Sequence, residues 1–280
     1  MSAKTEFPTT TWRLIISPPA RGAWNMAVDE AILEGVGHGL VPPTLRLYAW
    51  KPACLSLGYA QSVADADPKR LAAYGWDLVR RPTGGRAILH TDELTYAVIG
   101  PQDEPRLEGG VLESYQRLSR ALLAALLKLG LPAQAHALLS TNQNGDSKGP
   151  VCFEVPSNYE ITVNGKKLIG SAQARKREGV LQHGTLPLWG DLTRITQALC
   201  FPDENERNRA AARLKERATT VEEIRGDPLS WETVARAFVA AFEETLSLTL
   251  QQDELTPAEQ NRSEELIHQK YGNREWTERI

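Results

Sequence analysis

Residues 159–188 read YEITVNGKKLIGSAQARKREGVLQHGTLPL, and this stretch decides the fold that we expect. Apolar side chains recur at every second position before Asn164-Gly165, a pair that is the strongest short-range signal for a two-residue hairpin turn. The chain then returns through residues 166–172, turns once more and continues through residues 180–188. The pattern predicts a three-stranded antiparallel meander.

The same hairpin predicts which side chains share a face. A two-residue turn places Lys167 opposite Thr162, and uninterrupted alternation then places Ser171 on their side. The apolar residues are expected to bury on the other side: Ile161, Val163 and Leu168. Lys167 on the polar side is either a functional cation or an ordinary solvated lysine.

Patterns on both sides of the meander extend the fold. Short apolar runs predict further strands at residues 12–16, 44–48, 54–57, 77–81, 86–89 and 94–99. Periods of three and four residues predict helices over residues 24–35, over residues 115–129 and from about residue 230. Capping-box starts at Thr220 and Thr256 indicate a helical carboxyl end. We expect an α+β fold with a mixed, largely antiparallel sheet flanked by helices.

The whole chain is expected to form one domain, because no repeat, low-complexity tract or linker divides residues 1–280. Its core would cover about residues 12–200 and its helical carboxyl-terminal part about residues 201–280. A formal net charge of −3 argues against a nucleic-acid-binding protein. The amino terminus lacks the features of a secretion signal, and no stretch approaches the roughly 20 apolar residues of a membrane span. We therefore expect a cytoplasmic protein without membrane or nucleic-acid partners.

The three cysteines are widely spaced and fit neither a disulfide framework nor a zinc site, so we expect no metal. Cys54 and Cys200 have apolar neighbours in sequence and are predicted to be small core residues. Cys152 lies between two prolines in GPVCFEVPS, residues 149–157, which predicts a loop beside the meander. A nearby cation would be needed to favour its thiolate. Most loop cysteines are structural, and that interpretation stays open.

A glycine turn stands in RRPTGGRAILH, residues 80–90. Gly84 and Gly85 allow the backbone to approach a ligand closely, and the surrounding arginines supply hydrogen-bond donors. The alternative is a tight hairpin turn with a solvated basic rim. His90 could form a pocket wall or be a hydrogen-bonded core histidine.

Two triplets of small or polar residues interrupt the last strands of the meander: Gly170-Ser171-Ala172 and His183-Gly184-Thr185. Glycine within a strand marks a bulge or a ligand that lies against the backbone. Together they suggest a narrow slot on the sheet, suited to a slender apolar chain. Residues 175–177, Arg-Lys-Arg, are either a solvated tip or a docking surface for an acidic carrier protein.

These segments together resemble the lipoyl/biotin protein ligase family, from about residue 12 to the carboxyl end. The motifs that carry the resemblance are NMAVDE at 25–30, RRPTGGRAILH at 80–90, CFEVPSNYEI at 152–161, KKLIGSAQ at 166–173 and QHGTLPL at 182–188. The combination is far more specific than any single glycine turn. It implies the catalytic-domain fold of the biotin and lipoate protein ligases.

Within that family the sequence is most similar to cysteine-dependent octanoyltransferases. The resemblance implies an acyl-thioester on Cys152, a catalytic lysine at Lys167, octanoyl-acyl carrier protein as donor, and glycine cleavage H protein or another lipoyl domain as acceptor. No cofactor is implied, because the thioester is already activated. The expected substrate-binding residues are Arg81, Thr83, Gly84, Gly85, Arg86, His90, Gly170, Ser171, Ala172, His183, Gly184 and Thr185.

Three alternatives remain at this point. An ATP-dependent lipoate-protein ligase would use the arginines of the glycine turn for phosphates and would not need Cys152. An amidotransferase between lipoyl domains would use Cys152 with a different donor. A lipoyl-domain binding module without enzymatic activity would form no covalent adduct.

Overall fold

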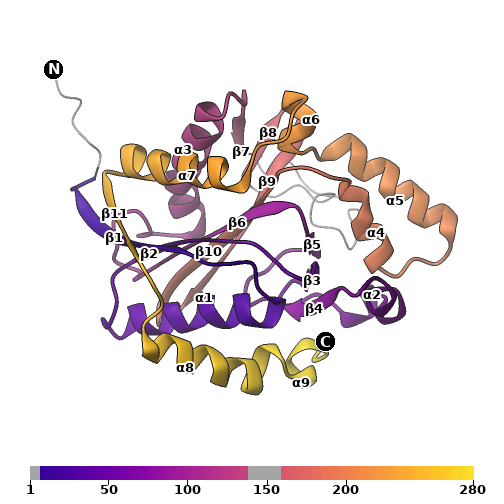
Figure 1. The fold of residues 1–280 in the computed structure, drawn as a ribbon, viewed down its shortest axis with the longest axis horizontal. Coiled ribbons are helices and arrows are strands. Elements are labelled where there is room, and N and C mark those ends of the chain that lie inside the picture. Colours follow the sequence, from indigo (N-terminus) through magenta and orange to yellow (C-terminus); the bar gives the residue numbers. More distant parts are fainter. Residues whose placement is uncertain (1–6, 138–158) are drawn as a thin grey trace.

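The computed structural model describes residues 7–137 and 159–280. An eight-stranded sheet crosses the molecule in the order β11-β1-β2-β6-β10-β9-β8-β7 (Figure 1). In chain order its strands are β1 Thr10–Ile16, β2 Thr44–Tyr48, β6 Glu93–Gly100, β7 Gln134–Ala137, β8 Tyr159–Val163, β9 Lys166–Lys176, β10 Gly179–Pro187 and β11 Leu248–Asp253. β1 runs parallel to both of its neighbours, and the other neighbouring pairs are antiparallel. The predicted mixed, largely antiparallel sheet is confirmed.

The meander of β8, β9 and β10 follows the sequence pattern, with one irregularity. Thr162 pairs with Lys167 as expected, but the next pair joins Ile161 to Ile169, which leaves Leu168 as an extra residue on β9. Leu168 and Ile169 both bury in the same hydrophobic cluster. The alternation of β9 therefore reverses beyond this bulge.

The bulge changes the partners of Lys167 on the sheet. The prediction that Ser171 lies on the same side as Lys167 is wrong, because it assumed uninterrupted alternation. The Ser171 hydroxyl lies 2.7 Å from the hydroxyl of Tyr96, a residue of the hydrophobic cluster on the opposite face. Gly170 and Ala172 take the face that Ser171 was expected to occupy.

The glycine turn belongs to a second, three-stranded sheet with the order β4-β3-β5, formed by β3 Cys54–Leu57, β4 Asp77–Arg80 and β5 Ile88–His90. β3 lies between the other two strands, parallel to β4 and antiparallel to β5. The interpretation of residues 80–90 as a tight hairpin is therefore wrong. The glycines instead connect two strands that do not pair with each other.

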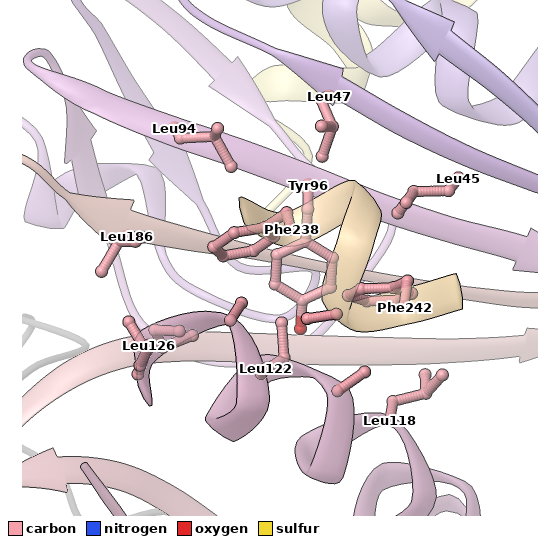
Figure 2. Packing of buried hydrophobic residues seen from close by; sticks show 14 of the residues in the cluster. Leu45, Leu47, Leu94, Tyr96, Leu118, Leu122, Leu126, Leu186, Phe238 and Phe242 are labelled. Carbon is pink, nitrogen blue, oxygen red and sulfur yellow. The ribbon is translucent and has the colours of Figure 1, made fainter. Parts of the chain in front are cut away.

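Helices cover both faces of the large sheet. α1 Gly22–Gly37 and α8 Pro257–Leu266 lie on one side, and α3 Val111–Lys128 and α7 Trp231–Leu246 lie on the other (Figure 1). In Figure 2, Tyr96 of the sheet points into the main core, between the phenylalanines of α7 and the leucines of α3. The apolar stripe predicted for α3 accounts for this packing, because Leu118, Leu122 and Leu126 on that stripe are buried, whereas Leu112 and Leu127 of the same helix are exposed.

The carboxyl-terminal part contains the expected helices and one strand that the sequence did not predict. Two short helices lie between β3 and β4: η1 Val63–Asp65 and α2 Pro68–Tyr74. The helices that follow β10 and are not yet named are η3 Leu192–Arg194, α4 Ile195–Ala198, α5 Glu204–Arg217, α6 Val221–Arg225, η4 Ile267–Tyr271 and α9 Arg274–Thr277. Thr256 and Glu259 form the predicted capping box. β11 extends the sheet beside β1, and β7 was also unpredicted. None of the helices in the described part of the chain is long and apolar enough to cross a membrane.

Two of the three cysteines lie within the described residues. Cys54 is fully buried, as predicted, and burial raises the pKa of its thiol well above the ordinary value. Cys200 is exposed, so the prediction of a core residue is wrong. Its chain position between Leu199 and Phe201 gave no sign that its side chain points outward at the end of α4.

Candidate active site

A cavity of about 220 Å³ lies between α1, the glycine turn, and strands β9 and β10. The predicted site residues that line it are Arg81, Gly85, Arg86, His90, Lys167, Gly170, Ser171, Ala172, His183, Gly184 and Thr185. Thr83 does not line the cavity but contacts His183, and Gly84 faces a neighbouring groove. Cys152 lies outside the described residues. The two glycine-containing triplets and the glycine turn, distant in sequence, thus meet around one hollow.

The register of β9 and β10 makes room for the cavity. Ala172 pairs with His183 and Gly170 pairs with Thr185, so a small residue on β9 faces each larger residue on β10. Gly184, between these two β10 residues, is oriented toward the other face of the sheet, where Ser171 and Tyr96 meet. A Cβ atom there would lie 2.5 Å from the Ser171 hydroxyl oxygen and 2.7 Å from the Tyr96 ring. Glycine at this position therefore leaves room for the side chains of Ser171 on β9 and Tyr96 on β6 to meet across β10.

Lys167 is a lining residue of the cavity and is only 3% exposed. The alternative of an ordinary solvated lysine is therefore wrong. Its neighbour Lys166 has the surface role instead and pairs with Glu223. The main chain at Lys167 is held from the opposite edge, because its carbonyl oxygen accepts a hydrogen bond of 3.1 Å from the Thr219 amide. β9 thus presents a buried amine at a fixed point of the wall.

Asp29 of α1 organises one wall of the cavity. Its carboxylate accepts hydrogen bonds from Arg46 at 2.7 Å and from the Tyr48 hydroxyl at 3.0 Å, and it lies 3.4 Å from Nδ1 of His183. Burial alone would raise the pKa of Asp29, but Arg46 and His183 together hold it below the ordinary value. Asp29 is therefore an anion inside the protein.

The same contacts define the state of His183. Burial lowers the pKa of His183 despite the nearby carboxylate, so the ring is neutral near pH 7. Because an ionised carboxylate only accepts, the single ring proton lies on Nδ1, and Nε2 accepts a 2.7 Å hydrogen bond from the Thr83 hydroxyl. Asp29 thereby fixes the first residue of the Thr83-Gly84-Gly85 turn through the imidazole.

His90 forms a second chain of the same kind. Arg81 donates to the Ser56 hydroxyl at 3.1 Å, Ser56 contacts Nε2 of His90 at 2.8 Å, and Nδ1 of His90 lies 2.7 Å from Glu93. Arginine is only a donor, so the Ser56 oxygen accepts from Arg81 and the hydroxyl links Arg81 to His90. His90 also stacks on Trp50, with 3.9 Å between ring centroids. Both earlier interpretations of His90 hold, since it is a fully hydrogen-bonded residue and a cavity wall.

The arginines of the glycine turn divide into two kinds. Arg80 and Arg81 are buried and donate to main-chain carbonyls, including those of Gly58, Gly84 and Arg86. They stabilise the turn itself, so the alternative of a solvated basic rim is wrong for these two. Arg86 is half-buried and lines both the cavity and the neighbouring groove.

Several lining residues were not predicted from the sequence: Met26, Tyr48, Trp50, Ser56, Ile88 and Thr95. Met26 and Asp29 lie in the NMAVDE motif, which was noted without a role for either residue. Alternation within β2 could have placed Tyr48 on the face of Arg46. Trp50 and Ser56 gave no local signal, since only the contact between the two sheets brings them to the cavity.

The arrangement favours a slender apolar ligand with one reactive end. The polar groups of the wall are largely paired with one another, which leaves an apolar interior with a buried amine at its side. A cavity of ~150 Å³ holds the six carbons of a benzene ring, so a cavity of about 220 Å³ has room, in the same proportion, for a chain of roughly nine carbons. The mouth of the cavity lies at Gly85 and Arg86, because Gly85 is the exposed residue of the lining and the adjoining Arg86 is half-buried.

Comparison with known families matches residues 21–243 to the lipoyl protein ligase A/B catalytic domain. The chain belongs to this family. It is 41% identical to the octanoyltransferase LipM of Symbiobacterium thermophilum over 275 residues, which cover 96% of this chain and 99% of that protein. The LipM octanoyltransferase of Kyrpidia tusciae is also 41% identical with the same coverage, and that of Halalkalibacterium halodurans is 38% identical over 95% of this chain and 98% of its own length. The chain is an enzyme, an acyltransferase, which excludes a binding module without activity.

Solved structures agree with this placement. The bipartite lipoate protein ligase of Thermoplasma acidophilum superposes with a TM-score of 0.80 at 25% identity, with 96% of each chain covered. A lipoate-protein ligase A bound with ATP gives a TM-score of 0.77 at 25% identity, with 96% of this chain and 98% of that chain covered. The expected biotin/lipoate protein ligase-like fold is confirmed.

Proposed function

We propose that this enzyme transfers an octanoyl group from acyl carrier protein to a lysine of a lipoyl-dependent protein, the glycine cleavage H protein or another lipoyl domain, through a thioester on Cys152. The observation that carries the proposal is the buried Lys167 amine in the wall of an apolar cavity sized for a medium acyl chain. Relatives named octanoyltransferases at 38–41% identity over nearly the whole chain support the acyl group.

In the first half-reaction the Cys152 thiolate attacks the carbonyl carbon of the donor thioester. The carbon–sulfur bond to the carrier breaks, the carrier leaves as a thiolate that takes up a proton, and the enzyme holds the octanoyl group as a new thioester. Lys167 supplies the cation that favours the thiolate. Backbone N–H groups near Gly84-Gly85 or Gly170-Ser171 are proposed donors to the oxyanion.

In the second half-reaction the neutral amine of the acceptor lysine attacks this thioester. An amide bond forms, the bond to Cys152 breaks, and the proton lost by the amine returns to the sulfur with the help of Lys167. The reaction is balanced without ATP or a metal, because each step exchanges one acyl bond for another. The proposed site residues are those that line the cavity, together with Thr83 and Gly84 of the turn.

The direct test is intact mass spectrometry of the purified enzyme after incubation with octanoyl-acyl carrier protein. We expect one octanoyl increment on the wild type, its transfer to added lipoyl domain, and no increment on Cys152→Ala. Lys167→Met should lower the rate of acylation by at least ~100-fold. An increment that persists in Cys152→Ala would refute the covalent route.

The structural likeness to ATP-bound lipoate ligase makes a ligase the second candidate. A ligase would modify a lipoyl domain with free lipoate and ATP, and this activity would survive Cys152→Ala. An amidotransferase would use Cys152 but accept the acyl group from octanoylated lipoyl domain and not from carrier protein. Supplying the three donors separately to wild type and Cys152→Ala therefore distinguishes the candidates.

A further inference from the structure

A second hollow lies next to the acyl cavity. It is a surface groove of about 730 Å³ between the outer half of β9, residues 173–176, and the loops at residues 59–61 and 84–86. Gly85 and Arg86 line both the groove and the cavity. A molecule whose acyl end occupied the cavity would therefore leave its mouth directly into this groove.

The groove carries positive charge that the described structure does not neutralise fully. Its lining includes Arg86, Arg175 and Lys176, and none of the lining residues in the described ranges is acidic. Lys176 pairs with Glu30 at 2.6 Å, and Arg175 donates to the main-chain carbonyl of Leu107 and to Gln173. Within residues 7–137 and 159–280, the guanidinium of Arg86 has no hydrogen bond or ion pair. Arg86 is thus a half-buried cation available to a ligand.

We propose that this groove binds the phosphopantetheine arm of the acyl carrier, with Arg86 as the contact for its phosphodiester. The inference rests on the proposed function, because it names how that donor is held. An acyl group on a carrier protein is tethered through a flexible arm whose only charged group is a phosphodiester. A guanidinium binds phosphate oxygens through paired N–H donors, which makes arginine suited to this contact.

The position of Arg86 gives the contact a second role. Its main-chain carbonyl accepts a hydrogen bond of 2.7 Å from Arg81, so the residue that would bind the phosphate is anchored to the glycine turn. Binding of the arm to Arg86 would thereby help to hold the glycine turn, which forms one wall of the acyl cavity, in place. Arg86 is proposed as a donor-binding residue and not as a participant in bond making.

The test compares octanoyl-pantetheine with octanoyl-4′-phosphopantetheine, which differ only in the phosphate, and includes octanoyl-acyl carrier protein as the complete donor. The rate of octanoyl-enzyme formation is followed by intact mass for wild type, Arg86→Ala, Arg86→Lys and Arg177→Ala. Arg177 is the matched control, since it is exposed at the β9–β10 turn and lines neither hollow.

We expect wild type to prefer the phosphorylated donor, and Arg86→Ala to lower the ratio of kcat/KM for phosphorylated over unphosphorylated donor by about 10- to 100-fold. Arg86→Lys should restore part of this ratio, added salt should reduce it in wild type, and Arg177→Ala should leave it within about twofold of wild type. Thermal unfolding of each variant checks that the fold is intact.

Three outcomes would overturn the inference. In the first, Arg86→Ala leaves the donor ratio unchanged. In the second, it slows only the transfer from octanoyl-enzyme to the lipoyl domain, which would assign the groove to the acceptor. In the third, Arg86 is needed for lipoyl-domain modification from free octanoate and ATP, which would assign it to a nucleotide. If wild type forms no adduct with any donor, the proposed function itself is wrong.

Discussion

Buried charge is concentrated around single residues of the cavity wall. Asp29 and Arg46 are both fully buried and 2.7 Å apart, and Asp29 also orients His183. The hydroxyl of Tyr48 completes the shell of the carboxylate. Such a cluster is stable only when every member is present, because a single buried charge left without its partner is strongly unfavourable.

Asp29→Asn tests this cluster. The substitution keeps the size of the side chain but leaves Arg46 without its anion, so we expect the free energy of unfolding to fall by about 3 kcal/mol. KM for the donor should also rise, since Thr83 loses the oriented imidazole. Urea unfolding and steady-state kinetics measure the two effects. Asp77→Asn, which removes a largely exposed ion pair with Arg21, should change stability by less than about 1 kcal/mol.

Met26 is an adaptable buried side chain in the wall of the acyl cavity. It is 1% exposed, and it contrasts with Gly85 at the exposed mouth. Two other large buried lining residues are fixed by hydrogen bonds, Tyr48 to Asp29 and Trp50 to Thr95. The thioether has no such bond among the described residues, and its unbranched chain adapts its shape.

Changing Met26 should therefore change the preferred acyl length. Met26→Ala enlarges the cavity and should raise the rate with decanoyl donor relative to octanoyl donor, whereas Met26→Phe should shift the preference toward hexanoyl. Met26→Leu conserves volume and serves as the control. Competition among donors of mixed length, read as the mass of the acyl-enzyme, measures the shift. Identical product distributions in all variants would contradict this role for Met26.

At the scale of elements, Glu30 connects three segments. From α1 it pairs with Lys176 of β9 at 2.6 Å and with Lys270 of η4 at 2.6 Å, and it accepts a hydrogen bond from Tyr271. Burial opposes its ionisation, but these partners outweigh that effect and lower the pKa of Glu30 to about 2. The helix, the sheet and the carboxyl-terminal segment therefore meet at one anion.

The lowered pKa predicts a pH-dependent contribution to stability. A carboxylate with a pKa of about 2 in the folded state and an ordinary value of about 4.3 when unfolded stabilises the fold by about 3 kcal/mol at neutral pH. The contribution is complete above the unfolded pKa and is lost as the pH falls toward the folded pKa. Glu30→Gln should thus destabilise the enzyme by about that amount at pH 7 and by progressively less between pH 4.5 and pH 2.

Urea unfolding of wild type and Glu30→Gln at pH 7 and pH 3.5 measures this difference. Glu34→Gln on the same helix is the matched control, since among the described residues Glu34 pairs with the partly exposed Arg262. This substitution should cost less than about 1 kcal/mol. A difference between wild type and Glu30→Gln that stays constant with pH would show that packing, and not charge, makes the contribution.

Elements with a clear period were predictable from the sequence, and those that depend on distant partners were not. Alternation around Asn164-Gly165 gave the meander and the pairing of Thr162 with Lys167. The bulge at Leu168 was hidden, because Leu168 and Ile169 are both apolar and the sequence alone cannot tell which of them is the extra residue. β11 was missed since only its parallel pairing with β1 makes it a strand.

Part of the candidate site was also predictable, because it is formed by residues that carry a local sequence signal. Glycine turns and small-residue triplets mark close backbone approach, and these residues do meet around the cavity. The wall residues Trp50 and Ser56 were not predictable, because they depend on how the small sheet docks against the large one. The burial of Arg80 was also hidden, since charged residues are usually exposed.

At the scale of the whole molecule, the carboxyl-terminal part is built into the core structure. β11 belongs to the large sheet, and α7 supplies Phe238 and Phe242 to the main core. We therefore propose that residues 1–280 fold as one domain. The boundary near residue 200 marks a change from mostly strand to mostly helix patterns in the sequence, and it does not divide the chain into two independently folding units. The last residues extend this dependence to the active site.

The final segment closes over the strand that leads into the glycine turn. The fully buried guanidinium of Arg80 donates to the carbonyl of Thr277 at 3.0 and 2.7 Å, and the Trp276 indole donates to the carbonyl of Arg80 at 2.9 Å. Arg279 lies 3.9 Å from the ring centroids of both Tyr59 and Trp276. The glycine turn is thus supported from behind by residues almost 200 positions later in the chain.

Deletion of residues 274–280 should therefore affect both stability and donor binding. Arg80 would lose the Thr277 carbonyl, which accepts two of its hydrogen bonds, while the rest of its guanidinium stays buried. We therefore expect the free energy of unfolding to fall by at least about 2 kcal/mol. The loosened turn should raise KM for the octanoyl donor more than it lowers kcat. Arg274→Ala removes only an exposed pair with Glu278 and should leave both quantities near wild type. Equal stability and equal KM in the deleted protein would show that the glycine turn holds its shape without this support.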